Sequence, residues 1–284
     1  MSAAISSPPM RRRVAIATRI AVTAGILGAC QAAAPLDPPQ PGSGVVDLPL
    51  PDGGVQRVLY RQPEHPVAAL VLLTGNEGRV LIDGSGRIVY GGGSFLVRTR
   101  EAWLAHGFAI AVLHSSTPLW TVRSTERYAD VLRRVVAYMR SQSDAPVWLG
   151  GQSMGSVAAT NAAAHLTHGE IAGLLLTSAV TLINKNVTET VFTAGLGRVT
   201  VPTLVVGHVD DDCVVTPASG VEAIRRGLTH ARKVEVLMIE GGAPPRSEAC
   251  MGLSPHGYLG VEARTVDRIV ERIMVLQTAA AQDD

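Results

Sequence analysis

A serine-centred motif is the part of this sequence whose residue types and spacing most directly suggest chemistry. Ser153 lies in the segment Gly151-Gln152-Ser153-Met154-Gly155, which follows an apolar stretch (147–150) and precedes an alanine-rich one (156–164). A strand, a tight turn and a helix in this order would hold Ser153 in a strained conformation at a helix N-terminus, where free N–H groups favour negative charge. Such a serine suits nucleophilic attack on a carbonyl, provided that a base and an orienting acid are present.

The candidates for the base are the eight histidines, of which His256 is the last in the chain. It lies in Ser254-Pro255-His256-Gly257, beyond the apolar stretch 234–239 and just before the last helix-like segment. His208 is the main alternative because it shares a loop with the candidate acids. The remaining histidines precede the serine, lie on or after the helix that follows it, or end a later helix: His65, His106, His114, His165, His168 and His230.

Three consecutive carboxylates could supply the acid. Asp210, Asp211 and Asp212 follow the apolar stretch 203–206. Side-chain directions diverge along such a run, so we expect one carboxylate to face the base and the others to face water or cap a helix. The residue types alone do not choose among the three.

The order of serine, acid and histidine around a G-x-S-x-G motif resembles the α/β-hydrolase superfamily. The resemblance implies a serine hydrolase in which Ser153 is the nucleophile and His256 the base. In this family the acid follows its strand by a few residues, which favours Asp211, then Asp210, then Asp212.

The same resemblance implies an oxyanion hole built from two backbone N–H groups. One would come from Met154, directly after the nucleophile. The other would come from Gly75 or Asn76, in the loop after the apolar stretch 68–73. The family's usual His-Gly is replaced here by Thr74-Gly75, so both donors in this loop stay open.

The elements that must position these residues follow an alternating pattern. Helix-period segments at 128–139 and 266–273 separate or follow short runs that are apolar on both faces, which is typical of a buried parallel sheet. We therefore predict an α/β chain with the α/β-hydrolase fold, a mostly parallel sheet covered on both faces, an edge hairpin at 45–61 and little or no lid at 179–201. The glycine-rich segment 83–94 is expected to form a mobile rim beside the site. The predicted strands are 68–73, 109–113, 147–149, 171–176, 203–206 and 234–239.

The cysteines suggest one disulfide. Of the three cysteines, Cys213 follows the acid run and Cys250 precedes His256. If acid and base meet, their loops run close together, and an oxidising compartment would let the two thiols join. Two unrelated buried thiols are the alternative.

The N-terminal segment predicts export. Arg11, Arg12 and Arg13 precede an apolar stretch (14–27) that ends in Leu27-Gly28-Ala29-Cys30. This resembles a bacterial lipobox, which implies a signal peptide at 1–30, lipidation of Cys30 and a periplasmic or outer-membrane-anchored lipoprotein of the cell envelope; a simply cleaved signal is the alternative. The proline-rich segment 31–44 is predicted to be a linker, and 45–284 the folded domain.

Composition narrows the range of partners. Twenty-five Lys and Arg residues balance 24 Asp and Glu residues, so there is no electrostatic reason to expect nucleic acid. The sequence has no H-E-x-x-H motif and no zinc-like cysteine spacing, so we predict neither a metal nor a cofactor. The expected partner is a small-molecule ester, with membrane contact only through the lipid anchor. A serine peptidase or amidase, or a non-catalytic envelope protein, are the alternative functions.

Overall fold

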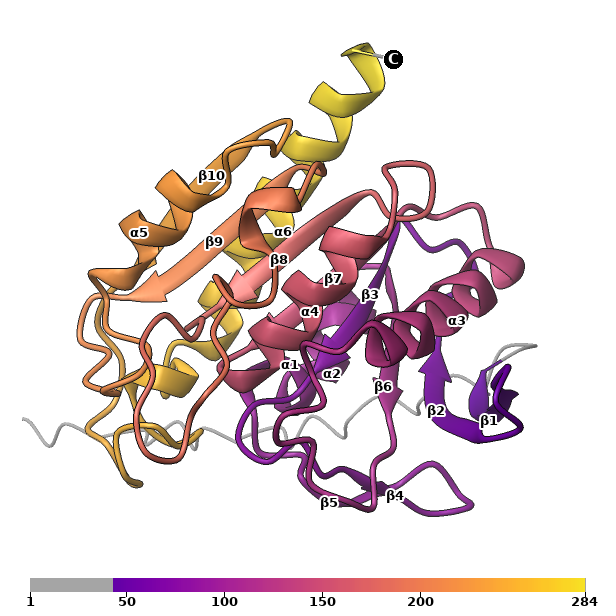
Figure 1. Ribbon diagram of the computed structural model, residues 1–284, viewed down its shortest axis with the longest axis horizontal. Coiled ribbons are helices and arrows are strands. Elements are labelled where there is room, and N and C mark those ends of the chain that lie inside the picture. The colour runs from indigo at the N-terminus through magenta and orange to yellow at the C-terminus, as the bar shows by residue number, and fades with distance from the viewer. Residues whose placement is uncertain (1–42, 284) are drawn as a thin grey trace, which may run out of the picture. The chain divides into compact units, whose positions relative to one another are not determined.

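A single mixed sheet forms the centre of the folded chain. The computed structural model describes residues 43–283, so the predicted signal peptide, Cys30 and nearly all of the predicted linker lie outside the described residues. The strands of the central sheet are β1 (Gly44–Pro49), β2 (Val55–Arg61), β3 (Ala68–Leu73), β6 (Phe108–Leu113), β7 (Val147–Gln152), β8 (Gly173–Thr177), β9 (Thr203–His208) and β10 (Val234–Ile239). Their order across the sheet is β1-β2-β6-β3-β7-β8-β9-β10, as Figure 1 shows.

Strand directions agree with the predicted architecture. β1 pairs antiparallel with β2, and β2 antiparallel with β6, so the predicted edge hairpin is confirmed. From β6 to β10 every neighbouring pair is parallel. The carboxyl ends of β3, β7, β9 and β10 therefore lie along one edge of the sheet, which is where the candidate site residues follow their strands.

The strand limits differ from the prediction in small ways, and the glycine-rich rim contains a short strand. β7 and β9 each continue into polar residues, while β8 begins at Gly173 rather than at 171. The rim at 83–94 contains β5 (Ile88–Tyr90), which pairs antiparallel with β4 (Leu81–Ile82). The turn between them is held by Asp83, whose side chain accepts from the backbone N–H groups of Ser85 and Arg87. Hydrogen bonds from Ser85 and Arg87 lower the pKa of Asp83 to about 2.

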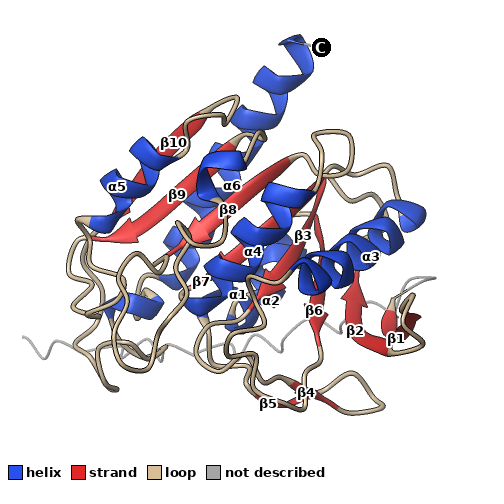
Figure 2. Ribbon diagram, viewed as in Figure 1, coloured by secondary structure: helices blue, strands red, loops and turns tan. Residues whose placement is uncertain are grey.

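Helices cover both faces of the sheet. They are α1 (Phe95–Arg98), α2 (Arg100–Ala105), α3 (Glu126–Gln142), α4 (Met154–His165), α5 (Gly220–Gly227) and α6 (Glu262–Asp283), with short 3₁₀ turns η1 (Leu196–Arg198) and η2 (Pro255–Gly257). α3, α4 and α5 lie over one face, and α1, α2 and α6 over the other (Figure 2). None of the helices in the described part of the chain has the length and apolar character needed to cross a membrane.

Two separate cores explain why the central strands are apolar throughout. In β3, Ala69, Val71 and Leu73 belong to the cluster under α3, α4 and α5. The alternate residues Ala68, Leu70 and Leu72 belong to the cluster under α1, α2 and α6. Because successive side chains point to opposite faces, a strand covered on both sides must be apolar at every position.

Helix α3 forms as its sequence period predicts. Thr125 caps its N-terminus, accepting from the backbone N–H of Tyr128 at 3.2 Å. Its buried residues recur at helical spacing along one stripe: Tyr128, Ala129, Leu132, Val135, Val136 and Met139. The stripe packs against the sheet and α4, so burial of apolar surface, rather than helix propensity alone, stabilises it.

Glycines let α4 approach the sheet closely. A Cβ atom at Gly155 would lie 2.3 Å from the backbone oxygen of Leu73. A Cβ atom at Gly151 would lie 2.4 Å from the backbone oxygen of Gly155. Neither backbone can accept a side chain without moving, so both glycines are required by contact distance.

Substitution of Gly155 tests this close approach. We expect Gly155→Ala to lower the free energy of unfolding by about 1–3 kcal/mol, because the new methyl group overlaps the backbone of β3. Urea denaturation followed by circular dichroism measures the change. Gly84→Ala is the matched control, since a Cβ atom there meets nothing within 4 Å. Equal stability of the two variants would contradict the close packing described here.

Candidate active site

The turn from β7 into α4 presents Ser153 in a strained conformation. Ser153 has φ 51° and ψ −126°, a combination that L residues rarely adopt. Its N–H donates to the carbonyl of Thr177 at 3.1 Å, and its carbonyl accepts from the side chain of Ser156 at 2.6 Å. Both backbone groups of Ser153 are thus held. Ser153 is the residue directly before α4, and it lines a cavity.

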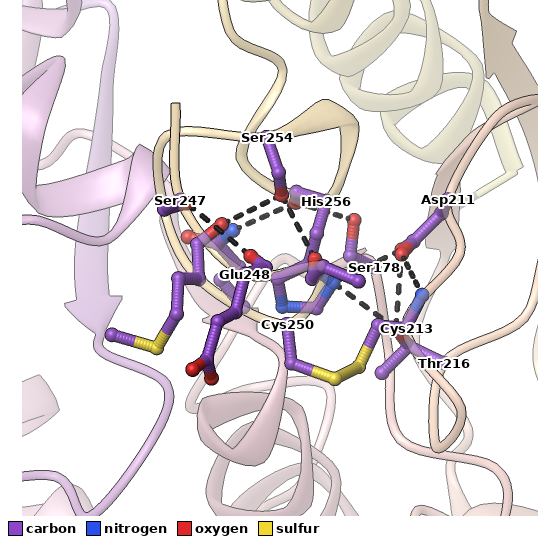
Figure 3. The surroundings of a disulfide bond; sticks show 12 residues. Ser178, Asp211, Cys213, Thr216, Ser247, Glu248, Cys250, Ser254 and His256 are labelled. Carbon is purple, nitrogen blue, oxygen red and sulfur yellow. Dashed lines mark hydrogen bonds and ion pairs between the residues drawn. A yellow bond between two sulfur atoms is a disulfide. The ribbon is translucent and has the colours of Figure 1, made fainter. Parts of the chain in front are cut away.

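A buried acid–base pair comes from two other loops. His256, in η2, has its Nδ1 atom 3.0 Å from the Oδ2 atom of Asp211, in the loop after β9 (Figure 3). The two residues are only 2% and 6% exposed. Asp210 and Asp212 are exposed, so of the three candidate acids the structure brings only Asp211 to the histidine.

Further hydrogen bonds fix this pair. The other carboxylate oxygen of Asp211 accepts from the backbone N–H of Cys213 at 3.0 Å. The carbonyl of His256 accepts from Gln152 Nε2 at 3.1 Å and from Ser178 Oγ at 2.9 Å. The imidazole therefore has a defined position, with Nδ1 occupied and Nε2 left for other partners.

The alternative histidine is engaged elsewhere. His208 has Nε2 2.8 Å from the carbonyl of Gly241, and its Nδ1 accepts from the backbone N–H of Asp210 at 3.1 Å. Both ring nitrogens thus bind backbone, and the His208 ring makes no hydrogen bond with the carboxylate of Asp211, whose oxygens bind Cys213, Thr216 and His256.

A disulfide joins the loops that carry the acid and the base. Cys213 and Cys250 are bonded, with their Cα atoms 4.6 Å apart and a sequence separation of 37 residues (Figure 3). Cys213 is buried and Cys250 is exposed. The bond ties the segment after β9 to the segment after β10, next to the Asp211–His256 pair.

Ser153 and His256 line one cavity of about 420 Å³. In the described part of the chain, the Oγ atom of Ser153 makes no hydrogen bond. The loop after β3 also lines this cavity, and it lies directly against Ser153, because a Cβ atom at Gly75 would be 2.8 Å from the Cβ atom of Ser153. The next residue, Asn76, has φ 49°. Met154 begins α4, where the first N–H groups have no partner within the helix.

Solved structures share this arrangement of strands and helices. Est1E from Butyrivibrio proteoclasticus is 15% identical with a TM-score of 0.57, covering 84% of this chain and 100% of its own. XC6422 from Xanthomonas campestris, described as an α/β serine hydrolase without lid, is 15% identical with a TM-score of 0.52, covering 82% of this chain and 97% of its own. The chain has the α/β-hydrolase fold. A dienelactone hydrolase from Anabaena variabilis is 14% identical with a TM-score of 0.55, covering 83% of this chain and 97% of its own. No family model and no curated protein matches the sequence.

Sequence reasoning missed several residues that support the site within this α/β-hydrolase fold. Thr216 Oγ1 donates to Asp211 Oδ2 at 3.1 Å and lies 3.0 Å from His256 Nδ1. Gln152 links two elements, since its Oε1 atom accepts from the backbone N–H of Phe95 at 2.5 Å while its Nε2 atom holds the His256 carbonyl. The position of Gln152 just before the nucleophile is a signal that sequence offers; Thr216 has no comparable signal.

Tyr258 helps to hold the His256 segment in place through its hydroxyl group. Tyr258 Oη donates to the carbonyl of Val206 at 3.1 Å and is also 3.1 Å from Ser178 Oγ. Burial raises the pKa of Tyr258. The phenol is therefore a neutral group that hydrogen-bonds to Ser178, the residue that also binds the His256 carbonyl.

The site offers no free set of metal ligands. Among the residues that the structure describes, Asp211, Cys213 and His256 form the one cluster of potential ligands. The sulfur of Cys213 is in the disulfide, and a metal ligand would have to be a thiolate. The carboxylate and the imidazole are bonded to each other instead.

The disulfide gives a stability test. Its loop of about 37 residues predicts a loss of roughly 3–4 kcal/mol in the free energy of unfolding when Cys213 and Cys250 are both replaced by Ala. Urea denaturation with and without a phosphine reductant measures this loss. The reductant should destabilise the native protein and leave the double variant, which keeps Cys30, unchanged. A reductant effect of equal size on both proteins would contradict the assignment.

Proposed function

We propose that this chain is an exported serine hydrolase that cleaves carboxylic esters through an acyl-enzyme intermediate. The observation that carries the proposal is the position of Ser153. It lies at a strained turn before a helix and faces the same cavity as His256, whose Nδ1 atom is held by the buried Asp211.

The reaction follows from these positions. Ser153 Oγ attacks the ester carbonyl while Nε2 of His256 accepts the hydroxyl proton, and the carbonyl electron pair moves onto oxygen. The N–H of Met154 and an N–H of the Gly75–Asn76 segment stabilise that oxyanion. As the tetrahedral intermediate collapses, His256 returns the proton to the leaving alcohol. Water then attacks the acyl-enzyme with the same base, releasing the acid and restoring Ser153.

Asp211 has a supporting part in this sequence. Its bond to Nδ1 keeps the proton of the neutral imidazole on that nitrogen, which leaves Nε2 free to accept. Its charge stabilises the imidazolium that forms. Because Asp211 is buried and already receives hydrogen bonds from Cys213 and Thr216, its orientation is fixed before substrate arrives.

Ester substrates are favoured over peptides with a free amine. The acidic residue on the described cavity wall is Glu77, and its Oε1 atom accepts from Tyr90 Oη at 2.9 Å and lies 3.5 Å from Arg79 Nη1. The bond to Glu77 raises the pKa of Tyr90. A carboxylate with these partners is poorly available for a substrate amine. Est1E and the dienelactone hydrolase among the structural neighbours point the same way, although an acylaminoacyl peptidase from Pyrococcus horikoshii, 12% identical with a TM-score of 0.53, shares the fold.

Export remains part of the proposal. The signal-like segment at 1–30 and the lipobox-like Cys30 support it from sequence. The Cys213–Cys250 disulfide is consistent with an oxidising compartment such as the periplasm. A lipid on Cys30 would tether the domain through the proline-rich segment 31–44.

Replacement of the nucleophile tests the proposal. We expect wild-type protein to hydrolyse short-chain nitrophenyl esters, and Ser153→Ala to lose about 10⁴-fold or more of that rate. Nitrophenol release measured at 405 nm is the readout, with a fluorophosphonate probe to label Ser153. A wild-type protein that neither hydrolyses esters nor takes the label would support the non-catalytic alternative. Labelling without ester turnover would favour amide substrates.

The acid run offers a matched series. Asp211→Asn should lower kcat by about 10⁴-fold, because the amide holds the wrong imidazole tautomer. Asp210→Asn and Asp212→Asn remove the same charge from exposed side chains one residue away, so their kcat should stay within about twofold. Steady-state kinetics on one nitrophenyl ester compares all three variants. A larger loss in either neighbour than in Asp211→Asn would reassign the acid.

A further inference from the structure

Arg123 is a buried cation beside the loop that faces the nucleophile. It is 1% exposed, the one arginine among the described residues that is fully buried. It lies in the segment between β6 and α3, and its burial lowers its pKa. Removing a guanidinium from water is costly unless its hydrogen bonds to water are replaced. The groups that accept from Arg123 therefore indicate what its burial stabilises.

Its strongest contact is with the loop after β3. Arg123 Nη2 donates to the carbonyl of Asn76 at 2.7 Å. The other terminal nitrogen, Nη1, is buried without a partner among the described residues. A Cβ atom at Gly78 would lie 2.6 Å from Nη2, so the guanidinium also packs directly against the end of this loop.

The nearby acid does not pair with Arg123 through a hydrogen bond. Glu189 is 7% exposed, and its Oε1 atom accepts from the N–H and the hydroxyl of Ser124. Its Oε2 atom, like Arg123 Nη1, is buried without a partner in the described structure. Glu189 offsets part of the buried charge at longer range, but the direct bond of the guanidinium is to the loop carbonyl.

The loop has a strained and closely held shape. Asn76 has φ 49° and Gly78 has φ 84°, and the N–H of Gly78 donates to the carbonyl of Gly75 at 3.1 Å. The carbonyl of Glu77 accepts from the N–H of Leu119 at 2.7 Å. Three successive carbonyls, those of Gly75, Asn76 and Glu77, are therefore each held by a separate donor.

Holding these carbonyls directs the N–H groups. In a trans peptide the N–H points away from the carbonyl of the preceding residue. The Gly78–Gly75 bond thus sets the direction of the Asn76 N–H, and the Arg123 bond sets the direction of the next peptide, between Asn76 and Glu77. The Asn76 N–H is one of the proposed oxyanion donors, and the Asn76–Glu77 peptide is the middle of the turn that the Gly78–Gly75 bond closes. Loss of the Arg123 bond would therefore loosen that turn and leave the Asn76 N–H free to move away from Ser153.

We infer that Arg123 is a positioning residue of the oxyanion hole, holding the 75–78 loop through the Asn76 carbonyl so that its N–H groups point at the developing oxyanion. The inference rests on the proposed function. Loss of one oxyanion donor costs about 10²- to 10³-fold in kcat, and a donor that is mispositioned rather than lost should cost about 10- to 100-fold.

The experiment compares Arg123→Met and Arg123→Lys with Arg127→Met. Arg127 is the matched control, since it lies only four residues further on and its side chain is 81% exposed. Each variant is measured for kcat and KM on a nitrophenyl ester and for thermal stability. Each is also measured for inhibition by an alkyl trifluoromethyl ketone, whose adduct with a serine carries an oxyanion, and by the matching methyl ketone, which serves as a ground-state competitor.

The expected pattern separates positioning from general structural damage. Arg123→Met should lower kcat by about 10- to 100-fold with KM within about twofold, and should weaken the trifluoromethyl ketone by the same factor as kcat/KM while sparing the methyl ketone. Arg123→Lys, which keeps the charge and a single ammonium group as donor, should show a kcat between those of the wild type and Arg123→Met. If Arg123→Met does not fold, the affinity of Arg123→Lys for the trifluoromethyl ketone must fall by the same factor as its kcat/KM.

Three results would overturn the inference. The first is a kcat for Arg123→Met equal to that of Arg127→Met. The second is an equal loss for both ketones, which indicates a structural role. The third is a wild-type protein that turns over no ester and binds neither ketone, which removes the proposed function itself and is recognised before any variant is compared.

Discussion

The backbone of Ser153 is the constraint on which the site depends. Its positive φ is enforced by the close approach of α4 to β3 and β7, which only glycine permits at positions 151 and 155. Residues in such conformations persist when the surrounding structure over-determines them. The strand pairing of β7 on one side and the hydrogen bonds of Ser153 to Thr177 and Ser156 on the other provide that support. The apolar sheet and its two helical layers thus hold one polar side chain at a fixed position.

The remaining groups of the site lie outside the strands of the sheet, in segments that no ladder of strand hydrogen bonds holds in place. The Asp211 loop and the His256 loop are instead joined by a disulfide and by the hydroxyl of Thr216, while Gln152 and Ser178 bind the His256 carbonyl from the ends of β7 and β8. The loop after β3 is held by bonds to three successive carbonyls. In each case a polar side chain or a covalent bond substitutes for the ladder of a sheet, which explains why so many buried polar residues lie near this cavity.

Sequence predicted the elements better than the contacts between them. β3 and β10 have the predicted limits. For β3 the reason is that a strand covered on both faces is apolar at every position and ends where polar residues begin. The G-x-S-x-G turn could be recognised because its two glycines are needed within a few residues of each other, where a side chain would overlap the backbone. The choice of Asp211 over Asp210 and Asp212 came from family resemblance, since all three share one local sequence. Thr216 and Arg123 were missed because their partners lie 40 and 47 residues away, and no local pattern records such a contact.

The two cores of this sheet bear on how such a chain diverges. Alternate residues of β3 contact different helical layers, so a change of side-chain volume on one face is compensated within that layer and is not transmitted to the other. Substitutions can therefore accumulate in each layer independently, as long as the apolar character of the strands is retained. Structures with the same arrangement at 12–15% identity show that this fold accommodates very different sequences. The residues least free to change are Gly151 and Gly155, where α4 meets the sheet and no space is left for a side chain.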